Sequence, residues 1–219
     1  MYREKELKLS NDNETKSTNE LEQNQESVLL EKSEKVRNLE PLNIIAKGEI
    51  ILILAGLKPA TVISIYGDKE SAQSLAKKIE ELGLIVIEKE NSPKEKIKKE
   101  TYKFAVSLSR EKAEQLLSLE PSRDEDHKRF GLLMGFPPTA VDAFVEKSSI
   151  LNLEEEKKLT EKLLPIFKFK FSTKNSKEEL KVLEKWNSTI FKCAPWLIED
   201  MLVNDEDVER YKNYLSTLH

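Results

Sequence analysis

The stretch that decides the fold begins with Thr61-Val62-Ile63-Ser64-Ile65, a run rich in β-branched residues that predicts a strand. Gly67-Asp68 ends this strand and begins a helix. The helix has one apolar face, formed by Ala72, Leu75, Ala76, Ile79 and Leu82. Gly83 follows directly, and a glycine at this place is typical of a helix end.

Two more strands and a helix complete this stretch. Leu84-Ile85-Val86-Ile87 is apolar throughout, which favours a central strand of a sheet. A charged connection leads to a third strand over residues 102–108. Ser109 then caps a helix that extends to about Leu119. We therefore expect the order strand, helix, strand, strand, helix.

The segments before this stretch differ sharply in composition. Residues 1–40 are rich in Glu, Asn, Lys, Ser and Gln, so we expect a mostly disordered tail with a short helix near its end. The apolar run 50–54 fits either a buried helix or an additional strand. Gly56 and Pro59 after it favour a helix over about 42–55.

Helical patterns dominate the remainder of the chain, with one exception. Phe167-Lys168-Phe169-Lys170-Phe171 alternates strictly, which predicts an edge strand with one buried face. Three pairs have the spacing of helix-capping residues: Thr139 with Asp142, Asn152 with Glu155, and Ser176 with Glu179.

Together these elements predict an α+β fold. We expect a small mixed or antiparallel sheet of four to five strands, in the split β-α-β order of ferredoxin-like domains, covered by helices. The core domain would comprise residues 41–173, with a helical insertion at 123–164. Residues 174–219 would form C-terminal helices packed on this core.

Composition excludes several classes of protein. The net charge of −4 provides no long-range attraction to nucleic acid or to an anionic membrane. A single cysteine, Cys193, excludes an internal disulfide and favours a reducing compartment. The longest uncharged apolar run, residues 50–57, is far shorter than the roughly 20 residues of a membrane span. We expect a cytoplasmic protein without membrane contact.

The sequence contains no recognisable motif for catalysis or cofactor binding. The glycines do not form a phosphate-binding or dinucleotide-binding pattern, so we expect no cofactor. A structural zinc site needs about four nitrogen or sulfur ligands, and the chain contains only Cys193, His127 and His219. A catalytic pair of Cys193 and His127 is disfavoured because Cys193 lies in the apolar stripe of a helix.

Three side chains are candidates for ligand binding. Lys58 occupies the turn before the first strand, where we expect contact with solvent or with an anionic ligand. His127 and Arg129 lie on the helix that begins near residue 123. No residue is assigned a catalytic or metal-binding role.

The segment from Phe130 to Phe144 is expected to be a structural corner. Gly135 should end the first helix with positive φ, and Pro137-Pro138 should hold the chain extended before the second. We expect the apolar residues Phe130, Leu133, Phe136, Val141 and Phe144 to pack beneath this corner. An exposed Phe144 would instead indicate an apolar docking site.

Two short motifs resemble landmarks of an uncharacterised bacterial protein family. Ala55-Gly56-Leu57-Lys58-Pro59-Ala60 matches its AGLKPA-like opening, and Leu133-Met134-Gly135-Phe136-Pro137 is similar to its LGYP-like helix break. The resemblance covers about residues 50–147. Because that family has no known activity, the resemblance implies no catalytic residue, cofactor or substrate.

The sequence favours a non-enzymatic interaction or regulatory module with an unidentified protein partner. One alternative is an enzyme or binding protein for a small anionic ligand, using Lys58, His127 and Arg129. Another is nucleic-acid binding through residues 123–147, which Asp142 and Glu146 on the second helix disfavour because they would repel phosphate. The sequence leaves open whether the protein is an enzyme.

Overall fold

A computed structural model describes residues 24–89, 101–120, 123–161, 163, 167, 169–200 and 209. The predicted tail up to residue 23, the charged connection 90–100 and nearly all of 201–219 lie outside the described residues. The described elements, in chain order, are a helix over 24–37, α2 (Ile44–Leu54), β1 (Ala60–Tyr66), α3 (Lys69–Glu80), β2 (Ile85–Glu88), β3 (Thr101–Ser107), α4 (Arg110–Ser118), α5 (Asp124–Leu133), α6 (Pro138–Val145), α7 (Leu153–Leu159), α8 (Ser176–Cys193) and α9 (Pro195–Glu199).

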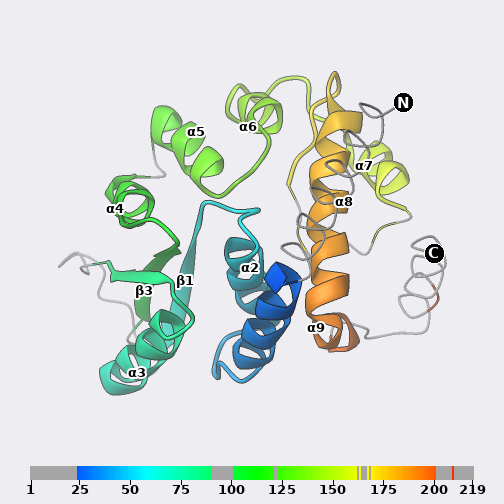
Figure 1. Cartoon of the computed structure of the whole chain (residues 1–219). Coiled ribbons are helices and arrows are strands. Elements are labelled where there is room, and N and C mark those ends of the chain that lie inside the picture. Colours follow the sequence, from blue (N-terminus) through cyan, green and yellow to red (C-terminus); the bar gives the residue numbers. More distant parts are fainter. Residues whose placement is uncertain are drawn as a thin grey trace, which may run out of the picture.

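The α+β class is confirmed, with a three-stranded antiparallel sheet in the order β1-β3-β2. One face of the sheet, which includes Ile63 and Phe104, belongs to the main core with α2 and α3. The opposite face, which includes Val62 and Ala105, packs against α4 and the end of α5. In Figure 1 the sheet lies on one side of the molecule and α8 on the other, with α2 between them.

The predicted four to five strands and the ferredoxin-like order are not confirmed. Residues 50–54 belong to α2, in agreement with the helix that the following Gly56 favoured. β2 is an edge strand and not a central one, and its apolar residues contact helices on both faces of the sheet. Residues 171–173 hydrogen-bond to 149–151 and not to the sheet, because the phenylalanines 167, 169 and 171 pack into the cluster around α8.

The N-terminal helix is part of the core. Val36 is fully buried, and the indole Nε1 of Trp196 donates a hydrogen bond to Ser33 Oγ at 3.3 Å. The short helix that the sequence predicts near the end of the tail is therefore present, and it belongs to the core. Within the described residues, no helix has the length and apolar character needed to cross a membrane.

Two helices end in the way the sequence predicts. After α2, Gly56 has φ +70°, and Leu57 N–H donates to the Leu52 carbonyl. After α5, Gly135 has φ +80°, and Phe136 N–H donates to the Gly131 carbonyl. Both are Schellman motifs, in which a residue in the left-handed region closes the last turn.

The three predicted capping pairs have different outcomes. Asn152 and Glu155 form the expected capping box at α7. Neither Thr139 nor Ser176 caps its helix, since α6 begins at Pro138 and the N-cap of α8 is Asn175. Thr139 and Glu179 instead contact each other across the fold, as described below.

Candidate functional site

The corner between α5 and α6 brings two helices very close together. A Cβ atom on Gly131 would lie 2.8 Å from Val141 Cγ2, so only glycine allows this approach. A Cβ on Gly135 would lie 3.0 Å from Pro59 Cδ and 3.3 Å from Lys58 Cα. The corner therefore rests on the turn between α2 and β1, and the two motifs of the resemblance are in direct contact.

An apolar groove opens beside this corner, and we call it the corner groove. Its volume is about 470 Å³. The residues that line it come from α5, the turn after α5, α6, α7 and residues 167–171, which we call the phenylalanine segment: His127, Phe130, Gly131, Phe136, Ala140, Val141, Phe144, Glu156, Phe169 and Lys170. Aromatic and aliphatic groups thus form most of its wall, as in most small-molecule and peptide sites.

Phe144 contradicts the prediction that it lies buried beneath the corner. Its side chain is 52% exposed and lines the groove. The ring packs edge-on against His127, with 6.4 Å between ring centroids. Val141, three residues earlier on α6, is buried against Gly131, in agreement with its predicted place beneath the corner.

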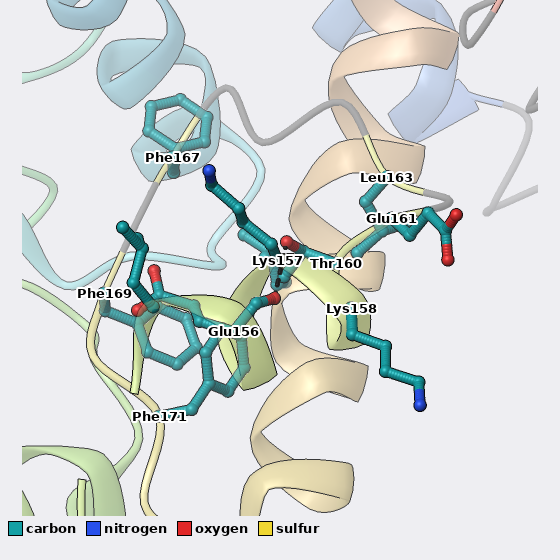
Figure 2. A pocket seen from close by; sticks show the side chains of 11 residues that line it. Glu156, Lys157, Lys158, Thr160, Glu161, Leu163, Phe167, Phe169 and Phe171 are labelled. Atoms are coloured by element: carbon teal, nitrogen blue, oxygen red, sulfur yellow. Dashed lines mark hydrogen bonds between the residues drawn. The ribbon is translucent and has the colours of Figure 1, made fainter. Parts of the chain in front are cut away.

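A second cavity of about 560 Å³ lies on the other side of Glu156 and Phe169. Figure 2 shows Phe169 and Phe171 beside Glu156, with Lys158 pointing away from them. The Glu156 carboxylate accepts a hydrogen bond from Lys170 Nζ at 3.0 Å, which holds α7 against the phenylalanine segment. Four charged side chains, Glu156, Lys157, Lys158 and Glu161, belong to its lining, so this cavity is more polar than the corner groove.

Lys58 is not the exposed turn residue that the sequence suggested. It is 2% exposed, and its Nζ donates to Glu49 Oε1 at 2.8 Å. The other carboxylate oxygen of Glu49 accepts a hydrogen bond from the Thr61 hydroxyl. The charge of Lys58 is therefore neutralised inside the protein and does not face solvent.

Three aromatic rings surround the ammonium group of Lys58. The Nζ atom lies 5.1 Å from the ring centroid of Trp186, 5.3 Å from that of Phe136 and 5.7 Å from that of Phe167. Each distance is within the range of a cation–π interaction. Phe136 also lines the corner groove, so Lys58 supports the groove wall from behind.

A buried carboxylate joins the elements around the groove. Glu179 on α8 accepts hydrogen bonds from the Thr139 hydroxyl at 2.6 Å, from Ser172 N–H at 2.7 Å and from the Ser172 hydroxyl at 2.6 Å. Its side chain is almost completely buried. These bonds connect α8 to the start of α6 and to Ser172, which directly follows the phenylalanine segment.

The structure does not bring the three predicted binding residues together. His127 lines the groove, Lys58 lies behind its wall, and Arg129 is an exposed residue of α5 outside the lining. The neighbouring Lys128 pairs with Asp142 on α6 at 2.7 Å, and this carboxylate raises the pKa of Lys128. The surface formed by α5 and α6 therefore carries charges of both signs, and the Lys128 charge is paired with Asp142.

Metal and thiol chemistry find little support in the described residues. No group of three or more His, Cys, Asp or Glu side chains converges there as a metal-ligand set. Cys193 is buried at the end of α8, and burial raises the pKa of its thiol. A raised pKa lowers the thiolate fraction at neutral pH, which opposes a nucleophilic role.

Comparison with known proteins identifies no relative: no protein family, no curated protein and no solved structure matches this chain. The family resemblance of the two motifs accordingly stays a prediction.

Proposed function

We propose that the protein is a non-enzymatic interaction module and that its corner groove receives an apolar side chain of a protein partner. The exposed Phe144 carries this proposal. A half-exposed aromatic ring next to a preformed apolar groove is typical of an interaction site, since aromatic residues are enriched in protein interfaces. On the composition given above, we place this function in the cytoplasm.

The rigidity of the groove supports the same function. The close contact of Gly131 with Val141 holds the two helices at a constant separation, and Glu179 fastens α6 to α8. A preorganised groove loses little conformational entropy when a partner binds.

The alternative, a small anionic ligand, has weaker support. The ammonium groups of Lys58 and Lys170 already pair with Glu49 and Glu156. An anion would have to compete with these carboxylates. A thermal-shift screen of anionic metabolites tests this alternative, because a hit abolished by Arg129→Ala would favour it over the interaction module.

The proposed module is tested by placing a photo-crosslinking amino acid at position 144 in cells. The crosslinked partner is identified by mass spectrometry and its affinity for purified variants is measured. We expect Phe144→Ala to weaken binding at least tenfold and to lower the melting temperature by no more than about 2 °C, as for a half-exposed side chain.

Leu108→Ala is the matched control, because Leu108 is also 52% exposed but does not line the groove. It should leave partner affinity unchanged. The proposal is wrong if Phe144→Ala binds the partner normally, or if it destabilises the protein by about 3–5 kcal/mol as a core aromatic would.

A further inference from the structure

The outer edge of β1 presents backbone groups that other described residues do not pair. Lys89 N–H donates to the Lys103 carbonyl, so Lys103 directs its backbone groups toward the β2 side of β3. In an antiparallel sheet alternate residues of a strand bond to opposite neighbours, so Phe104 bonds to its partner Ile63 in β1. It follows that Val62, Ser64 and Tyr66 direct their N–H and C=O groups outward.

The side chains of β1 alternate between exposed and buried with the same period of two residues. Ser64 and Tyr66 are exposed and Val62 is half-buried, whereas Ile63 and Ile65 are in the core. Within the described residues no backbone hydrogen bond joins the outward groups to another segment. The predicted fourth strand, which could have covered this edge, pairs with residues 149–151 instead.

β1 lacks the features by which proteins protect a free edge. Strand β1 contains no charged residue, no proline and no glycine. Natural edge strands usually carry such residues, because an unprotected edge pairs readily with another chain. Tyr66, at its end, is 68% exposed. The edge is therefore suited to accept a strand.

A groove runs along this edge, between β1 and α2. Its volume is about 470 Å³, and its walls are residues 62–66 of β1 and residues 41–49 of the segment that contains α2. Leu42, Ile45 and Ala46 provide an apolar wall, with Ile45 53% exposed. From Val62 to Tyr66 the edge is about 14 Å long, at about 3.4 Å per residue, which matches a strand of five residues.

Three carboxylates lie near the groove, and they differ in whether a cation pairs with them. Thr61 hydrogen-bonds to Glu49, so the start of β1 lies beside the middle of α2 and the end of β1 lies near the segment before α2. Glu40, before that segment, is 78% exposed and pairs with Lys47 Nζ at 2.8 Å. Glu49, inside the groove, is neutralised by Lys58. Asp68 follows β1, is exposed and has no ion pair with another described residue, so the unpaired acidic charge lies at the Tyr66 end.

We infer that the β1 edge binds an extended segment of a partner protein by strand addition. The segment has apolar residues at every second position, which face α2, and a lysine or arginine at the end next to Tyr66. Its backbone bonds to Val62, Ser64 and Tyr66, as in other strand-addition complexes.

This site is separate from the corner groove, since the two share no lining residue. Its test uses the full-length protein and a displayed library of random ten-residue peptides. We expect enrichment of peptides that alternate apolar and polar residues and carry a basic residue at one end. The selected peptides are then synthesised and their affinities measured by fluorescence anisotropy.

Two substitutions at one position separate backbone pairing from side-chain effects. Ser64→Pro removes the outward N–H but leaves the bonds between β1 and β3, and should weaken peptide binding at least tenfold. Ser64→Val retains the N–H and should change affinity less than twofold. Ile45→Ser, in the helix wall, is a second test that does not alter β1, and should weaken binding at least threefold.

Amide hydrogen exchange of Val62, Ser64 and Tyr66 provides the direct readout. These amides should exchange rapidly in the unbound protein and at least tenfold more slowly with peptide bound, while those of Ile63 and Ile65 stay protected throughout. The inference is overturned if no library peptide is enriched, or if the selected peptides bind Ser64→Pro and Ile45→Ser normally. Protection of the three amides without peptide, or a dimer in solution that Ser64→Pro dissociates, would assign the edge to this chain itself.

Discussion

The ion pair between Lys58 and Glu49 should be the most sensitive polar contact in the core. Replacing Lys58 with Met retains most of the side-chain length and removes the charge. The Glu49 carboxylate then retains only the Thr61 hydroxyl and its 14% solvent exposure. Removing one partner of a buried pair costs about 3–5 kcal/mol, and the partial exposure of Glu49 places Lys58→Met near about 3 kcal/mol.

Replacing the other partner, Glu49, with Gln leaves the Lys58 ammonium without its carboxylate, and Lys58 is the more deeply buried of the two charges. The Lys58 ammonium retains the three aromatic rings, which offset about 0.5–2 kcal/mol of the cost. We expect a net loss of about 3 kcal/mol. In the double variant neither charge remains, so its loss should be smaller than the sum of the single losses by at least about 2 kcal/mol.

Equilibrium urea unfolding of the four proteins measures these differences. A loss of about 3 kcal/mol corresponds to a decrease in melting temperature of roughly 6–12 °C for a chain of this size. Lys181→Met is the matched control, because its pair with Glu178 is exposed and should contribute less than about 1 kcal/mol. A loss below about 1 kcal/mol for Lys58→Met, or additive losses in the double variant, would refute this reasoning.

Four further variants test the corner and the helix ends. Gly135→Ala should cost about 1 kcal/mol or more in urea unfolding, because φ is +80° and the Cβ would press on Pro59; no loss would contradict the left-handed conformation. Gly131→Ala should cost about 1–3 kcal/mol through its overlap with Val141, and Val141→Ala should restore part of that loss when combined with it. Glu179→Ala should cost about 2–4 kcal/mol, because three donors, two of them on the buried Ser172, lose their acceptor; thermal unfolding with unchanged stability would refute that role. The hydrogen bonds from Ser71 lower the pKa of Asp68 in the folded state, so its contribution is complete above its ordinary pKa and is lost as pH falls; Asp68→Asn should lack this acid dependence in pH-resolved melting curves.

Several elements followed directly from the sequence. The strand at 61–65, the helix that Gly83 ends and the capping box of Asn152 and Glu155 lie where the pattern predicted. Gly56 and Gly135 also have the predicted positive φ. At the helix ends and in the capping box the deciding contacts join residues within about six positions of one another, so the local sequence already contains both partners.

Other features depend on contacts between distant residues. Thr139 and Glu179 have the sequence spacing of caps, but their side chains bond to each other across 40 positions. The alternation in residues 167–171 correctly indicated one buried face, but a strand also needs a neighbour for its backbone, and that neighbour is the segment 149–151. Side-chain periodicity contains no information about which backbone lies alongside.

In the candidate site, too, some features follow from the local sequence and others from contacts between distant residues. The sequence identified the corner and its two helices, together with His127 as a residue of the site. It did not identify Glu49, Gly131 or Glu179, because an acid on an apolar helix and a glycine within a helix have no distinctive spacing. The burial of Lys58 and the exposure of Phe144 were decided only by tertiary packing, since burial depends on which distant side chains fill the space around a residue.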